Sequence, residues 1–103
     1  MLDKEKAREL AIQYAAEVCK SLKPKAIILF GSYINGNPHE HSDIDIAVVV
    51  HDFQGDWLET AAMLCKLTRR VSIDIEPHLM DEASDQSGFL EHIRENGETI
   101  YAA

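Results

Sequence analysis

The fold and the candidate chemistry are both decided by residues 42–50, which read Ser42-Asp43-Ile44-Asp45-Ile46-Ala47-Val48-Val49-Val50. The long apolar run predicts a buried strand. Strand alternation puts the two aspartates on one face, and the isoleucines beside them point the opposite way, into the core. Two facing carboxylates repel each other unless a cation lies between them, so the segment suits one or two hard divalent ions. An acidic pair at the solvated end of a strand would show the same pattern.

A second acidic segment follows about thirty residues later, at residues 71–76, and Pro77 is predicted to close it. Alternation divides this predicted strand into an apolar face of Val71, Ile73 and Ile75 and a polar face of Ser72, Asp74 and Glu76. If this strand lies beside residues 43–50, it brings a third carboxylate to the same site. Three carboxylates with two metal ions are the minimum for in-line phosphoryl transfer. A half-exposed structural strand would show the same alternation.

A short apolar strand is predicted at residues 26–30, directly before the turn Gly31-Ser32. Glycine lets backbone N–H groups approach a ligand and serine adds a hydroxyl donor, so the turn could cradle phosphates. The connection from Gly31 to Ser42 is rich in turn-forming residues, including Gly36. A Gly-Ser turn alone is too common to identify a site.

Helices are predicted around these strands. Residues 3–22 form an amphipathic pattern with Asp3 as the N-cap, and a second helix begins after Asp56. A short helix ends at Gly97, before a last extended piece at residues 99–101. The order predicts an α/β (α+β) fold with helices packed on one small sheet, and a single domain over residues 1–103. Cys19 and Cys65, both within predicted helices, are expected to be buried free thiols.

The composition narrows the classes of partner. The formal charge is −8, from 18 acidic and 10 basic residues. Since phosphate backbones are held mainly by Lys and Arg, sequence-independent binding to nucleic acid is disfavoured. Neither a signal peptide nor a membrane span is expected, which predicts a cytoplasmic protein.

The combination of Gly31-Ser32, Gly36 and Ser42-Asp43-Ile44-Asp45, followed by a carboxylate strand, is more specific than any of its parts. It resembles the DNA polymerase β-like nucleotidyltransferase superfamily, in particular its minimal prokaryotic members. The resemblance covers residues 29–76 by motif and nearly the whole chain by layout. It implies a small mixed β-sheet flanked by helices.

The resemblance also implies roles for individual residues. Gly31 and Ser32, with Gly36 and Ser42 in the same connection, match the nucleotide-binding positions, and Asp43 and Asp45 match the two aspartates that bind Mg²⁺ or Mn²⁺. The third carboxylate is Glu76 or Asp74. Glu76 is favoured because Ile75-Glu76-Pro77-His78 looks like the strand ending of that family.

The implied activity is transfer of a nucleoside monophosphate, AMP from ATP, to a hydroxyl. Members that look like this chain act beside a small helical HEPN-type protein as antitoxin to its toxin, which implies a tyrosine of that partner as the acceptor. Many relatives carry Arg or Lys before the second glycine, whereas this chain reads Tyr33-Ile34-Asn35-Gly36. That departure favours an alternative, a nucleotide-binding module with weak turnover that covers a partner protein. A homo-oligomer is compatible with the sequence.

Overall fold

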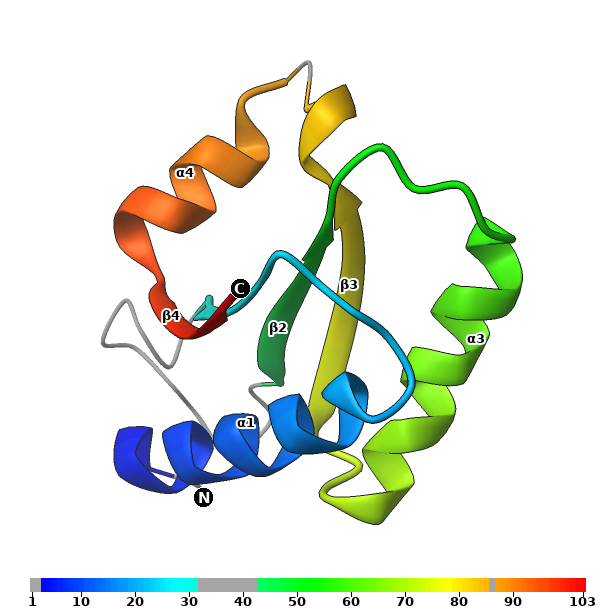
Figure 1. The fold of residues 1–103 in the computed structure, drawn as a ribbon. Helices are drawn as coiled ribbons and strands as arrows, with labels where there is room; N and C mark the ends of the chain where they lie inside the picture. The colour runs from blue at the N-terminus through cyan, green and yellow to red at the C-terminus, as the bar shows by residue number, and fades with distance from the viewer. Residues whose placement is uncertain (1–2, 32–42, 86) are drawn as a thin grey trace.

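The computed structural model describes residues 3–31, 43–85 and 87–103, which form one mixed sheet with helices on both faces. Figure 1 shows the helices around the sheet. In chain order the elements are α1 (Lys4–Cys19), β1 (Ala26–Phe30), β2 (Ile44–Val50), α3 (Trp57–Leu67), β3 (Ile75–Asp81), α4 (Phe89–Asn96) and β4 (Glu98–Ala102). The 3₁₀ turns Thr68–Arg70 and Glu82–Ser84 flank β3.

The strand order is β3-β2-β1-β4. β1 pairs antiparallel with both β2 and β4, whereas β2 and β3 are parallel. The parallel pair needs a crossover connection, and α3 supplies it. The α/β fold class with a small mixed sheet is thereby confirmed.

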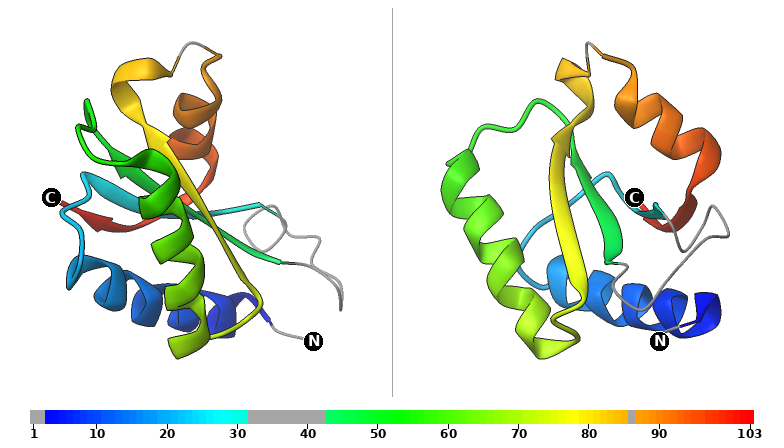
Figure 2. Two further views of the ribbon diagram at one scale, coloured as in Figure 1. Left: turned by 90° about the vertical axis from the view of Figure 1, so that its right-hand side faces the viewer. Right: turned by 180° about the vertical axis from the view of Figure 1, so that it is seen from behind.

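Each face of the sheet carries its own apolar core. One core joins α1 and α3 to the buried side chains Ile27, Leu29, Ile44, Ile46 and Val48. The other joins Leu90 and Ile93 of α4 to Ala26, Ile28, Ala47 and Val49. Figure 2 shows α1 and α3 on one side of the sheet and α4 on the other. Alternation therefore turns Asp45 toward the α4 side, while its isoleucine neighbours are fully buried on the opposite side.

The predicted helix caps are confirmed. Asp3 accepts a hydrogen bond from the Lys6 N–H at 2.8 Å, and Asp56 accepts one from the Glu59 N–H at 2.9 Å. Each cap satisfies one backbone donor that the first helical turn leaves without a partner. The buried-thiol prediction is wrong, because Cys19 and Cys65 are both exposed.

The predicted extent of the third strand is also wrong. β3 begins at Ile75 and continues through Pro77 to Asp81, and Ile73, expected in the core, is 85% exposed in the preceding turn. The Ile44 N–H donates to the Asp74 carbonyl at 2.8 Å, so even-numbered residues of β3 turn their backbone groups to β2. Pro77 then faces the open edge of the sheet, where no N–H is needed.

Tyr14 joins α1 to α3. Its ring is fully buried, and its hydroxyl donates to the Leu64 carbonyl at 2.6 Å. The Thr68 N–H donates to the carbonyls of Cys65 and Lys66 instead of Leu64. Burial raises the pKa of Tyr14 well above its usual value, so the hydroxyl remains a donor. The bond therefore satisfies a carbonyl at the end of the crossover helix.

Tyr14→Phe should lower the free energy of unfolding by about 1–3 kcal/mol, because the buried Leu64 carbonyl loses its hydroxyl donor. Urea denaturation followed by circular dichroism measures the change. Tyr101→Phe is the matched control, since the structure gives the Tyr101 hydroxyl no hydrogen bond with the described residues. Equal stability of the two variants would contradict this role for Tyr14.

Candidate functional site

The candidate site lies where β2 and β3 begin, on the side of the sheet that faces α4. Their parallel register places Asp45 directly opposite Glu76 and Ala47 opposite His78. The Asp45 side chain is 24% exposed and Glu76 is exposed on the edge strand. Two carboxylates thus face each other across neighbouring strands at a position open to solvent.

His78 extends the pair along the same face. Its Nε2 lies 3.1 Å from Oδ1 of Asp45, and its ring centroid is 5.3 Å from that of Phe30. The hydrogen bond to Asp45 raises the pKa of His78 above its ordinary value. Sequence reasoning missed His78 because Pro77 was expected to end the strand. Continuing the two-residue alternation past Pro77 would have placed His78 on the same face as Glu76.

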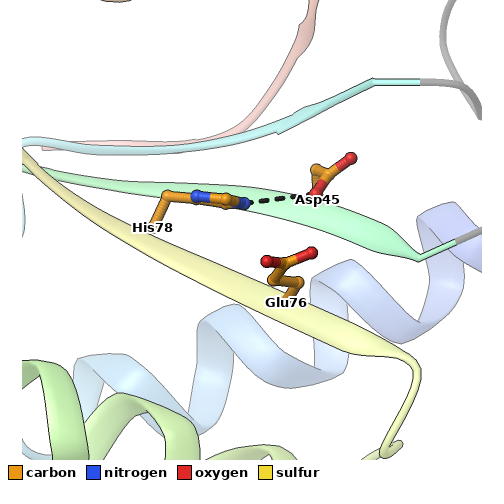
Figure 3. Close-up of side chains that lie close together, drawn as sticks. All are labelled: Asp45, Glu76 and His78. Atoms are coloured by element: carbon orange, nitrogen blue, oxygen red, sulfur yellow. Dashed lines mark hydrogen bonds and ion pairs between the residues drawn. The ribbon is translucent and has the colours of Figure 1, made fainter.

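Asp45, Glu76 and His78 each offer a ligand atom within 4.8 Å of the other two. Figure 3 shows the three side chains gathered at the β2–β3 pair, with the hydrogen bond between His78 and Asp45. Carboxylate oxygens are the ligands that Mg²⁺ prefers, whereas imidazole suits softer transition metals. The carboxylates therefore fit Mg²⁺ or Mn²⁺. The hydrogen bond of His78 to Asp45 is the kind that orients a metal-binding carboxylate.

Asp43 adds a further acidic group at the start of β2. A hydrogen bond shared with the Asp43 carboxyl raises the pKa of Glu76, and partial desolvation acts in the same direction. The negative charges of Asp45 and Asp43 raise the pKa of Glu76 further, as repulsion between crowded carboxylates does. A divalent cation would relieve the same repulsion, so this crowding supports a metal site.

Gly31 lies directly against the Asp45 carboxylate. Its φ is +85°, and a Cβ built on it would lie 2.3 Å from Oδ2 of Asp45. Any other residue would be strained by the backbone conformation and would also displace the carboxylate. We call Asp43, Asp45 and Glu76 the acidic cluster. Because Gly31 has no side chain, the main chain can approach this cluster, as a phosphate-binding turn requires.

The structure separates the two candidates for the third carboxylate. Asp74 lies in the turn before β3, exposed, and its N–H bonds to the Ser72 hydroxyl at 3.1 Å. Asp43, Asp45, Glu76 and Gly31 are brought together instead. The other predicted nucleotide-binding residues, Ser32, Gly36 and Ser42, lie outside the described residues.

None of the helices in the described part of the chain is long and apolar enough to span a bilayer. No curated protein sequence is significantly similar to the chain.

Solved structures show the same architecture. A candidate nucleotidyltransferase from Sulfolobus solfataricus superposes with a TM-score of 0.69 at 19% identity, over 96% of this chain and 83% of that one, a likeness of fold alone. A toxin–antitoxin structure with AMP-PNP gives a TM-score of 0.60 at 27% identity, over 89% of this chain and 73% of that one. A MntA-HpeT toxin–antitoxin variant with two Asp-to-Glu substitutions gives a TM-score of 0.59 at 25% identity, over 99% of this chain and 75% of that one.

The sequence profile of the family described as "Polymerase beta, Nucleotidyltransferase" matches residues 13–103, which include the whole sheet and the acidic cluster. With the fold and the site geometry in agreement, the chain belongs to the polymerase β nucleotidyltransferase family.

Proposed function

We propose that this chain, as a single domain, is a magnesium-dependent nucleotidyltransferase that transfers AMP from ATP to a hydroxyl group. The acceptor we propose is a tyrosine of a small helical HEPN-type toxin, to which the chain acts as antitoxin. The observation that carries the proposal is the Asp45–Glu76 pair, which faces across parallel strands with the Gly31 main chain against Asp45. Such an arrangement puts metal-binding oxygens beside a phosphate-binding turn.

The relatives support both the nucleotide substrate and the protein partner in this proposal. One toxin–antitoxin structure contains AMP-PNP, an ATP analogue. The MntA-HpeT variant has its Asp-to-Glu substitutions two positions apart, the spacing of Asp43 and Asp45 here. Family membership makes nucleotidyl transfer the expected chemistry, and the relatives point to a protein partner.

The site residues have these proposed roles, of which Glu76 has two. Asp43, Asp45 and Glu76 would hold Mg²⁺, which supplies positive charge to the attacking and leaving oxygens. Backbone N–H groups at Gly31 bind the triphosphate. His78 keeps the Asp45 carboxylate in place through its 3.1 Å hydrogen bond.

The proposed reaction is a displacement at the α-phosphorus of ATP. The acceptor oxygen forms a bond to the α-phosphorus, the bond from the α-phosphorus to the bridging oxygen breaks, and pyrophosphate leaves. Glu76 is exposed on the edge strand, where an acceptor can approach, and it takes the hydroxyl proton.

A second candidate function is a nucleotide-binding antitoxin with weak turnover that acts by covering its partner. The specific observation behind it is the stretch Tyr33-Ile34-Asn35-Gly36, which lacks the basic residue of many relatives. Incubating the chain and the protein of its neighbouring gene with Mg²⁺ and labelled ATP distinguishes the two. Label on the partner supports the enzyme, whereas stable complex formation without label supports the binding module.

Mg²⁺ or Mn²⁺ should raise the melting temperature. An ion that binds only the folded state at about ten times its Kd contributes about 1.4 kcal/mol, or about 5–10 °C for a domain of this size. Differential scanning fluorimetry with and without EDTA measures the shift. The shift should disappear in Asp45→Asn. An unchanged melting temperature at millimolar metal, with and without ATP, would count against the metal site.

Asp43→Asn and Asp45→Asn should each reduce transfer at least about 100-fold while the fold is retained, since asparagine keeps the shape and loses the charge. Transfer is measured with labelled ATP and a verified acceptor. The matched control is Asp52→Asn at the far end of β2, whose φ of 48° asparagine tolerates. Full activity in either site variant would exclude that residue as a metal ligand.

Glu76→Gln should reduce turnover far more than Asp74→Asn, because only Glu76 is paired across the strands with Asp45. Binding of ATP should change little in either variant. Single-turnover rates and ATP titrations separate the two effects. The reverse order would transfer the role to Asp74, and insensitivity to both changes would remove the support for a third carboxylate.

A further inference from the structure

A cavity of about 220 Å³ lies beside the acidic cluster, between the end of β1 and the inner side of α4. Figure 1 shows α4 next to the β1–β4 side of the sheet. The lining residues are Phe30, Gly31, Phe89, His92, Ile93, Asn96 and Gly97.

The cavity and the acidic cluster share a wall. Gly31 lines the cavity and also lies against the Asp45 carboxylate. The Phe30 ring contacts His78, with centroids 5.3 Å apart, and meets the Phe89 ring edge-on at 6.2 Å. A molecule whose phosphates lie at Gly31 and Asp45 therefore has this cavity next to it.

The chemistry of the lining suits a flat aromatic ring. Two phenylalanines provide ring faces or edges, and the lining residues that the structure describes include neither Lys, Arg nor a carboxylate. Phe89 is 50% exposed, so part of its ring is available for contact. The volume is below the about 300–1,000 Å³ of pockets that hold a whole drug-sized ligand, so only part of a nucleotide would enter.

Asn96 gives the cavity a directed polar group. Its Nδ2 donates to the His92 carbonyl at 2.9 Å and lies 3.2 Å from Nδ1 of the same residue. Both contacts hold the amide in one orientation. Among the residues that the structure describes, none donates a hydrogen bond to the amide oxygen of Asn96. That oxygen can therefore accept one from a ligand.

We propose that this cavity is the nucleobase subsite, in which the base stacks on Phe89 and an amino group of the base donates to the amide oxygen of Asn96. This inference rests on the proposed function, since it takes the phosphates to lie at Gly31 and Asp45. It deepens that function by naming the part of the chain that distinguishes a nucleotide from a bare polyphosphate. Stacking on aromatic side chains accepts any base, and the amide adds a preference for bases that carry an amino group.

The test compares two probes by titration calorimetry in the presence of Mg²⁺, AMP-PNP and inorganic tripolyphosphate, which has no base. AMP-PNP should bind the unaltered chain more tightly than tripolyphosphate. Phe89→Ala should lower the affinity for AMP-PNP about tenfold, as expected for a lost base–aromatic stack, and leave the affinity for tripolyphosphate unchanged. Phe89→Tyr, which keeps the ring, should restore the affinity. Asn96→Ala, at an exposed helix position, should also weaken the binding of AMP-PNP and leave the binding of tripolyphosphate unchanged.

Trp57→Ala is the matched control. Trp57 lines a neighbouring cavity that Phe89 also lines, and it does not line this one. Affinity of Trp57→Ala for AMP-PNP should equal that of the unaltered chain, and melting temperatures verify that every variant is folded. A loss in Trp57→Ala as large as in Phe89→Ala would overturn the assignment in favour of the neighbouring cavity.

Two further results would overturn the proposal. If tripolyphosphate binds and neither Phe89→Ala nor Asn96→Ala affects AMP-PNP, the base lies elsewhere and the proposed function is untouched. If neither probe binds the unaltered chain, the proposed function fails and the subsite fails with it.

Discussion

The parallel pairing of β2 with β3 is the constraint on which the site depends. Its register sets Asp45 opposite Glu76 and places His78 one pair further along the same face. A slip of one residue would turn Glu76 and His78 to the face covered by α1 and α3, among buried aliphatic side chains. Because parallel strands need a crossover, the register depends on α3, and the Tyr14 hydroxyl bond fixes α3 to α1. The geometry of the acidic cluster is thus held by a helix on the far side of the sheet.

The unequal covering of the two faces leaves room for chemistry. In the described part of the chain, α1 with 16 residues and α3 with 11 cover one face, and α4 with 8 residues covers the other. Among the described residues, the apolar core on the α4 side reaches Ala47 of β2 and does not include the residues that precede it in that strand. Like-charged groups can gather there at modest cost because solvent reaches them: the Asp45 side chain is 24% exposed and Glu76 is exposed on the edge strand.

Local patterns in the sequence were enough to predict most of the fold. The strand at residues 26–30 and the cap at Asp56 depend on neighbouring residues alone, and both were predicted correctly. The errors lie where tertiary position decides. Pro77 usually ends a strand, but an edge position makes it harmless, and only the strand order reveals that edge. The same error hid His78, and the turn that exposes Ile73 also separates Asp74 from the carboxylates gathered around Asp45.

Pro77 also has a consequence for how other proteins meet this molecule. An exposed edge strand normally invites strand addition from another chain, and β3 borders the site. With no N–H at the middle of that edge, an incoming strand cannot form a continuous ladder with β3. Sheet extension between copies is thereby discouraged at the edge that carries Glu76. A protein that binds this edge of the sheet therefore has to contact it through side chains.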